Sequence, residues 1–514
     1  MLFNSYEFML AFLPVFVIGY FIIRHFFRTG DRLMRLCNLW IIAGSLVFYA
    51  LFGIKNLLVL ALSIAVNLFF IRGLKSENYG DKAVSDSFFT KKGKQKVIIL
   101  LAVGIGFNVL TLLFFKFSGI FFPIAISFYT FNQISYLVES YRGEIRKFEL
   151  LEYLSYILFF PKLLQGPLMS YGDYNDQLQE SSRHKFDWEI VMRGLLLISI
   201  GLFKKVILAD TIGQAVDYGY NSLATLGWWE AVLVAIFYSF QIYFDFSGYC
   251  DVAGGICMIM GFELSINFDS PYKAVNIIDF WNRWHITLTK FFTKYIYIPL
   301  GGSRKGTVRT YVNIMIVFLV SGLWHGSGWT FIIWGVMHGA LNVMTRVKED
   351  LIVRRQKNEL PTGESNKHNE NHTTVDKTLI CLTNCGKQLF TFIYVTVAWV
   401  FFRANTVSDA LLLFERMFSG GIRPYYSDFA NYFRLDEIWY VFKLTPIVNY
   451  NFSWDLCMWL FLAVAIVIVF FSKKAIYFAK ECRISLLTTF FTAILLVWCV
   501  LSFGGVSTFL YMNF

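Results

Sequence analysis

Long apolar runs, separated by short polar or charged connections, recur along the whole chain. An α-helix needs about 20 mostly apolar residues to cross the roughly 30 Å hydrocarbon core of a bilayer. The runs therefore predict membrane helices over 7–27, 37–53, 56–72, 97–118, 121–140, 189–209, 228–246, 311–323, 328–345, 379–402, 455–473 and 484–504. Because backbone polar groups find no water in hydrocarbon, we expect an all-α polytopic bundle of about 11 to 13 membrane helices.

Two stretches depart from this pattern. Positions 150–302 mix apolar runs with proline, glycine and polar residues, which predicts re-entrant or tilted helices packed inside protein. Positions 345–378 form the one extended polar segment and predict a flexible loop. His368 and His372 in that segment have a metal-like spacing, but nothing around them supports a metal site. We expect a single membrane domain over 1–514.

Composition and charge agree with a membrane protein. The chain is 56% hydrophobic and 16% charged, whereas soluble domains carry about 25% charged residues. Its net charge of +11 comes from lysines and arginines between the apolar runs. This distribution indicates cytoplasmic loops at 28–35, 72–96, 142–147 and 473–483. We therefore expect no nucleic-acid partner. Both termini are then expected outside the cytoplasm, and 1–20 is expected to stay as a first helix. The eight cysteines form no disulfide or zinc pattern.

Two histidines lie in the apolar runs, His325 in Ser321-Gly-Leu-Trp-His-Gly and His338 in Trp334-Gly-Val-Met-His-Gly. An ionisable side chain at bilayer depth is costly and usually marks function. The two are 338 − 325 = 13 residues apart, so on one continuous helix they would point to nearly opposite faces. Both can act at one site only if the helix breaks, and the neighbouring glycines favour a break.

Polar groups are densest between Asp245 and His285. Asp245 and Asp251 are either polar links between helices or supports of a site. In Asp279-Phe-Trp-Asn-Arg-Trp-His, the side chains of Asp279 and Arg283 are predicted to pair at i and i+4 on a helix. His285 then either lies at the membrane interface or lines a wet cavity. The chain has no Gly-x-Ser-x-Gly nucleophile elbow, phosphate-binding loop or HExxH motif.

These phrases together resemble the membrane-bound O-acyltransferase (MBOAT) family, in its alginate O-acetyltransferase-like branch. The resemblance covers nearly the whole chain in order. It rests on Met1-Leu-Phe-Asn-Ser-Tyr-Glu-Phe, Phe128-Tyr-Thr-Phe-Asn-Gln-Ile-Ser-Tyr, Phe160-Pro-Lys-Leu-Leu-Gln-Gly-Pro, Asp245-Phe-Ser-Gly-Tyr, Phe280-Trp-Asn-Arg-Trp-His, Tyr297-Ile-Pro-Leu-Gly-Gly-Ser-Arg, Gly322-Leu-Trp-His-Gly and Trp399-Val-Phe-Phe-Arg.

The resemblance implies a helical bundle around a central tunnel, with His325 as the catalytic histidine and His285 as its catalytic partner. His325 would act as general base or as a transient acyl acceptor. His285 would orient or polarise the acyl donor. The residues expected to hold these two side chains in position are Asp245, Asp251, Arg283 and His338.

The implied activity is an acyltransferase, for groups other than aminoacyl groups, in the bacterial plasma membrane. It would pass an acyl group, first of all acetyl, from a cytoplasmic donor to an exported polysaccharide such as alginate or another cell-envelope glycan. No bound cofactor or metal is expected; the donor would be acetyl-CoA or another acyl thioester. An extracytoplasmic acetyltransferase is the expected partner protein. The alternatives are D-alanyl transfer to teichoic acid and a transporter with a histidine proton relay.

Overall fold

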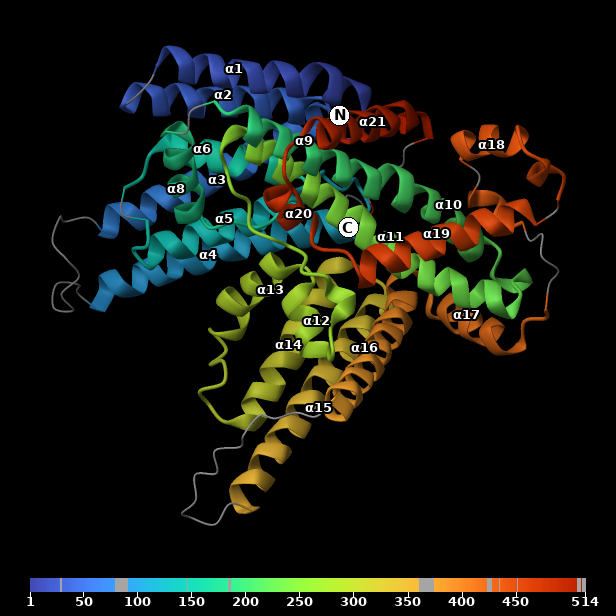
Figure 1. Cartoon of the computed structure of the whole chain (residues 1–514). Helices are drawn as coiled ribbons and strands as arrows, with labels where there is room; N and C mark the ends of the chain where they lie inside the picture. The colour runs from blue at the N-terminus through green and yellow to red at the C-terminus, as the bar shows by residue number, and fades with distance from the viewer. Residues whose placement is uncertain are drawn as a thin grey trace. The chain divides into compact units, whose positions relative to one another are not determined.

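The computed structural model describes residues 1–27, 30–78, 91–145, 147–183, 186–359, 374–422, 428–433, 435–450, 452–505 and 510. All regular elements within these ranges are helical (Figure 1). Nine helices among the described residues are long and apolar enough to cross a membrane. These observations confirm the predicted all-α polytopic membrane fold.

The chain divides into two compact units. Unit 1 comprises residues 1–207, 245–266 and 475–514, and unit 2 comprises 208–244 and 267–474. The π-helix η2 (Phe203–Ala209) and the helix α11 (Trp228–Met260) contribute residues to both units. The single domain over 1–514 stays a prediction.

Unit 1 is built from the N-terminal helices, half of α11 and two C-terminal helices, and α1 and α2 run side by side in it (Figure 1). Its remaining elements are η1 (Glu7–Phe12), α1 (Leu13–Phe26), α2 (Asp31–Ala50), α3 (Ile54–Asn78), α4 (Lys91–Phe117), α5 (Ile126–Tyr141), α6 (Leu150–Leu158), α7 (Phe160–Leu163), α8 (Tyr171–Arg183), α9 (Trp188–Leu202), α20 (Ala475–Glu481), α21 (Leu486–Leu501) and η8 (Ser502–Gly505).

Unit 2 holds three long neighbouring helices, α14, α15 and α16, with shorter ones packed around them (Figure 1). Its elements are α10 (Asp210–Asn221), η3 (Leu223–Thr225), η4 (Pro271–Lys273), α12 (Ile277–Arg283), α13 (Ile286–Phe292), η5 (Thr293–Tyr297), α14 (Thr307–His325), α15 (Trp329–Glu359), α16 (Thr374–Arg403), α17 (Val407–Ser419), η6 (Ala430–Phe433), α18 (Asp436–Lys443), η7 (Pro446–Asn449) and α19 (Ser453–Phe470).

Three predicted membrane helices differ from the structure. The run 121–140 becomes α5, a helix of 16 residues with nearly every side chain buried, polar ones included. The run 189–209 divides into α9 and the π-helix η2, which carries two lysines. The run 328–345 lies in the much longer α15, in which threonine, histidine and asparagine interrupt the apolar positions. Polar side chains packed inside protein explain all three differences.

The flexible loop predicted over 345–378 is corrected at both ends. The helix α15 continues through residue 359, and α16 begins at residue 374. Lysine, glutamate and arginine are good helix formers, so a polar stretch can extend a membrane helix into water. Positions 360–373, with His368 and His372, lie outside the described residues.

Candidate active site

The helix α14 ends at His325, whose side chain is buried. Gly326 takes extended backbone, its N–H donates to the Gly322 carbonyl at 3.1 Å, and the next helix begins only at Trp329. The predicted break between His325 and His338 is therefore confirmed. The two histidines lie on two different helices of one hairpin.

Two glycines bring the arms of that hairpin together. A Cβ atom added at Gly322 would lie 2.5 Å from the Phe331 carbonyl oxygen, and one at Gly335 would lie 2.6 Å from the Phe318 carbonyl oxygen. Small residues permit such close approach between membrane helices. The close packing places the first turns of α15 beside the end of α14.

Aromatic rings surround the His325 imidazole. Its ring centroid lies 4.9 Å from that of Phe402 and 5.2 Å from that of Trp334, nearly perpendicular to both. Trp334 stacks on Trp399 at 5.8 Å. A water-poor wall of this kind strengthens every electrostatic interaction within it.

His338 also contacts Trp334. Its side chain is fully buried, and its ring centroid is 5.0 Å from that of Trp334. The indole Nε1–H of Trp281, on α12, donates to His338 Nδ1 at 3.3 Å. The break in the hairpin thus lets His325 and His338 contact the same tryptophan ring.

His285 occupies the turn between α12 and α13 and is buried. Its backbone is left-handed, with φ 44° and ψ 52°. Asn267 holds the turn: its carbonyl accepts from the Ile286 N–H at 3.0 Å, and its Oδ1 accepts from the N–H and hydroxyl of Thr287 at 3.2 and 2.6 Å. Burial lowers the pKa of His285 to about 3, so this imidazole is neutral at physiological pH.

Indole rings link the surroundings of His285 and His325. Trp284, next to His285, lies 5.1 Å from Trp399 between ring centroids, and Trp399 stacks on the Trp334 ring that contacts His325. Ring contacts of unit 2 therefore connect His325 and His338 with Trp284, the chain neighbour of His285. We call the set His285, His325, His338, Trp281, Trp284, Trp334, Trp399 and Phe402 the histidine cluster.

Arg283 supports the turn before His285 through charge. Its Nε donates to Asp279 Oδ1 at 2.7 Å, which confirms the predicted i, i+4 pair. Its backbone carbonyl accepts from the Asp269 N–H at 2.9 Å. The guanidinium is about one-third exposed, so Arg283 fixes the turn from outside the buried cluster.

Asp245 and Asp251 lie in unit 1, each paired with a lysine of η2. Lys205 Nζ is 2.7 Å from Asp245 Oδ1, and Lys204 Nζ is 2.6 Å from Asp251 Oδ2. The other Asp245 oxygen accepts from the Leu510 N–H at 3.0 Å. Glycines allow α9 to lie against α11 here: a Cβ atom at Gly248 would lie 2.7 Å from the Gly201 carbonyl oxygen. These aspartates therefore serve buried ion pairs within unit 1.

Sequence reasoning missed several partners of the candidate residues. Trp281 lies within a phrase that carries the resemblance, Trp334 in the phrase that contains His338, and Asn267 in the polar stretch before His285. The sequence does not say that the two tryptophans contact histidines or that Asn267 holds the turn of His285. The adjacent pair Lys204 and Lys205 interrupts an apolar run. Charge at membrane depth is the signal that could have pointed to a buried ion pair there.

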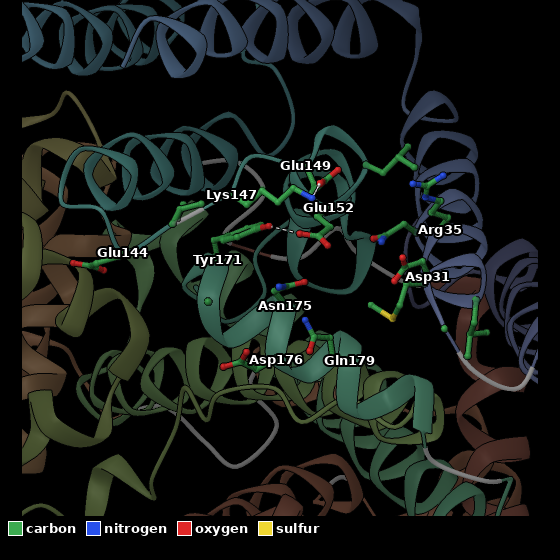
Figure 2. Close-up of a pocket in the computed structure, with 17 residues that line it drawn as sticks. Asp31, Arg35, Glu144, Lys147, Glu149, Glu152, Tyr171, Asn175, Asp176 and Gln179 are labelled. Carbon is green, nitrogen blue, oxygen red and sulfur yellow. Dashed lines mark hydrogen bonds and ion pairs between the residues drawn. The ribbon is translucent and has the colours of Figure 1, made fainter. Parts of the chain in front are cut away.

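A cavity of about 1220 Å³ lies in unit 1 (Figure 2). At its wall the Tyr171 hydroxyl donates to Glu152 Oε2 at 2.6 Å, and Lys147 pairs with Glu149 at 2.6 Å. Carboxylates outnumber cations on its lining: Asp31, Glu144, Glu149, Glu152 and Asp176 against Arg35 and Lys147. The cavity therefore suits a cation better than an anion.

The described residues contain no group of three or more His, Cys, Asp or Glu side chains arranged to hold a metal ion. What the histidine cluster offers instead is neutral or near-neutral acid–base chemistry in a closed aromatic surrounding. Such a site can take a proton from a hydroxyl, donate a hydrogen bond to a carbonyl, and exclude water from a reactive acyl group.

Comparison with known proteins agrees with these features. The chain is 36% identical to a peptidoglycan O-acetyltransferase of Helicobacter pylori over 81% of its own length and 80% of that protein's. It is 32% identical to a probable alginate O-acetylase of Pseudomonas putida, over 82% and 81%. It is 29% identical to a teichoic acid D-alanyltransferase of Streptococcus thermophilus, over 42% and 55%. The sequence model of the membrane-bound O-acyltransferase family matches residues 9–346, so this chain is a multi-pass bacterial membrane acyltransferase that belongs to the MBOAT family.

Proposed function

We propose that the protein takes an acyl group from a cytoplasmic thioester and passes it on for O-acetylation of an exported polysaccharide. The proposed acyl group is acetyl. The observation that carries this proposal is His325, buried at a helix break within an aromatic wall. The names of the peptidoglycan and alginate relatives support an acceptor among cell-envelope glycans such as peptidoglycan or alginate. The D-alanyltransferase matches less than half of the chain and supports a more distant relationship.

His325 performs the proton transfer. As general base it takes the proton of an acceptor hydroxyl while that oxygen attacks the thioester carbonyl carbon; the new C–O bond forms, the C–S bond breaks, and the proton passes to the leaving thiolate. In the second form of the step, an imidazole nitrogen of His325 attacks the thioester carbonyl carbon, the C–S bond breaks and the thiolate leaves. The acceptor hydroxyl then attacks the acyl-imidazole, and the C–N bond breaks to release His325. His285, neutral because of its burial, orients or polarises the donor.

Acetyl-CoA or another acyl thioester is the donor, and an extracytoplasmic acetyltransferase is the partner that completes transfer to the polysaccharide. The charges that line the cavity of unit 1 decide whether the donor could bind there. Residues 31, 35, 144 and 147 on its lining belong to or border loops predicted to be cytoplasmic. Its excess of carboxylates would repel the phosphates of coenzyme A, so we assign donor binding elsewhere.

The test uses the purified protein in lipid nanodiscs with radiolabelled acetyl-CoA and a glycan or short-chain hydroxyl acceptor. We expect label on the protein or acceptor with wild type and none with His325→Ala, while both elute as one sharp peak in size-exclusion chromatography. His25→Ala is the matched control, because His25 is an exposed histidine in α1. Wild-type transfer by His325→Ala would refute the proposed role. Proton flux across liposomes without acyl transfer would favour the transporter alternative.

A further inference from the structure

Two fully buried N–H donors of α15 have no acceptor among the residues that the structure describes. Trp334 Nε1 and His338 Nε2 are shielded from solvent, and neither makes a hydrogen bond with any residue that the structure describes. More than nine in ten buried polar groups in folded proteins have a partner. These two donors lie one turn apart on α15 and can serve an acceptor on a bound molecule.

The chemistry of His338 is fixed by Trp281. An indole N–H only donates, so His338 Nδ1 must be the acceptor of that hydrogen bond. In the neutral imidazole the proton then resides on Nε2. A second proton on Nδ1 would direct one N–H at another, which disfavours the imidazolium. His338 is consequently a hydrogen-bond donor and has no free lone pair with which to act as a base.

The two donors share one face of the helix. Trp334 and His338 are four residues apart on α15, with ring centroids 5.0 Å apart. The same Trp334 ring lies 5.2 Å from the ring of His325. Trp334 thus contacts both His325 and His338, and it connects the two donors with the candidate catalytic histidine.

We propose that Trp334 and His338 form a donor pair that binds the carbonyl oxygen of the acyl group. This inference rests on the proposed function. As the nucleophile attacks the carbonyl carbon, the C=O electron pair moves onto oxygen, and the two N–H groups stabilise that charge. When the carbonyl re-forms, the C–S bond breaks and its electron pair leaves with the thiolate. Preorganised donors of this kind are among the largest contributors to catalysis of acyl transfer.

Three substitutions separate the donors from the shape of the rings. Trp334→Phe removes one N–H and keeps an aromatic ring. His338→Asn keeps an acceptor opposite Trp281 but loses the donor at Nε2, whereas His338→Gln returns a donor close to that position. Trp459→Phe is the matched control, because Trp459 is half exposed on α19 of the same unit.

We expect Trp334→Phe and His338→Asn each to lower kcat about 10²- to 10³-fold with little change in KM. His338→Gln should recover a large part of that loss, and Trp459→Phe should behave as wild type. A structural role alone would instead lower thermal stability and affect His338→Gln and His338→Asn alike.

A second measurement does not depend on turnover. The infrared carbonyl stretch of carbon-13 acetyl-CoA, or of S-acetylpantetheine, is recorded on His325→Ala protein with and without the donor pair. We expect a shift to lower frequency that disappears in the Trp334→Phe/His338→Asn background. If wild type transfers acetyl and the donor variants keep full kcat, the donor pair is refuted and the proposed function stands. If no transfer occurs but the shift is present, the donor pair stands as a carbonyl site and the proposed function fails. Neither transfer nor shift with both thioesters refutes both.

Discussion

The two units bury polar groups in opposite ways. In unit 1, full charges face each other: Lys205 with Asp245 and Lys204 with Asp251, all in or beside the contact between η2 and α11. In unit 2, His285 and His338 are buried, His338 packs among aromatic rings, and the described surroundings provide no carboxylate partner for His338.

The difference separates structure from chemistry. A buried ion pair satisfies itself, so it leaves nothing for a substrate, and removing one member leaves a buried charge. A neutral imidazole costs less to bury, and a nitrogen without a protein partner remains available to a bound molecule. We therefore look for stability in the paired charges and for reactivity in the histidine cluster.

The largest expected effect comes from Lys205→Met. Asp245 would keep its charge in a fully buried position without a cation, and the free energy of unfolding should fall by about 3–5 kcal/mol. Denaturation in detergent measures it. The double variant Lys205→Met/Asp245→Leu should recover most of the loss, since it buries no charge. Wild-type stability of Lys205→Met alone would contradict the role of the pair.

Asn267→Ala probes the turn that carries His285. Two buried donors of Thr287 would lose their acceptor, which should cost about 1–3 kcal/mol and lower acyl transfer because His285 is displaced. Thr287→Val removes one of the two donors and should have a smaller effect on both measurements. Unchanged activity of Asn267→Ala would show that acyl transfer does not need these hydrogen bonds of Asn267.

Trp281→Phe tests what holds His338. The hydrogen bond between Trp281 Nε1 and His338 Nδ1 is lost, which should lower the free energy of unfolding by about 1 kcal/mol. With Nδ1 released, either nitrogen can carry the proton, so we expect a partial loss of acyl transfer. Trp459→Phe is again the control, and equal activity of the two variants would oppose the proposed tautomer.

The smallest effect on acyl transfer is expected from the titration of His285. Because burial lowers its pKa to about 3, the folded protein binds this proton less readily than the unfolded chain, whose histidine pKa is about 6.5. Its contribution to stability therefore falls as pH drops below about 6.5. Between pH 5 and 8 the pH profile of kcat/KM should keep the same shape in His285→Gln. If one limb of the pH profile disappears in this variant, that limb reports the ionisation of His285, which would contradict a pKa of about 3.

The membrane fold could be predicted because hydrocarbon enforces helices on long apolar runs. The helix break after His325 was also predictable, since three glycines lie at 322, 326 and 328. The structures of 121–140 and 189–209 could not be predicted, because a run that faces protein and one that faces lipid have similar composition. The extension of α15 was missed because polarity alone does not distinguish a loop from a solvated helix.

The candidate residues could be found from the sequence, but not their partners. Nothing local predicts that Trp281 meets His338 or that Lys205 meets Asp245, since the pairs are separated by 57 and 40 residues. Contacts of this length depend on how helices pack. Sequence grouped Asp245 and Asp251 with the histidines, whereas the structure gives them a charge partner each in unit 1.

The left-handed backbone at His285 links catalytic loss to gain in folding. Asparagine and glycine adopt this conformation more readily than most residues, so His285→Asn should fold at least as well as the parent while lacking the imidazole. Alanine at the same position would combine backbone strain with loss of the ring. During evolution, mutation of His285 to asparagine or glycine would not lower the stability of the fold. Only selection for the reaction would therefore oppose it. A descendant that had given up acyl transfer would therefore be expected to record that loss first at position 285.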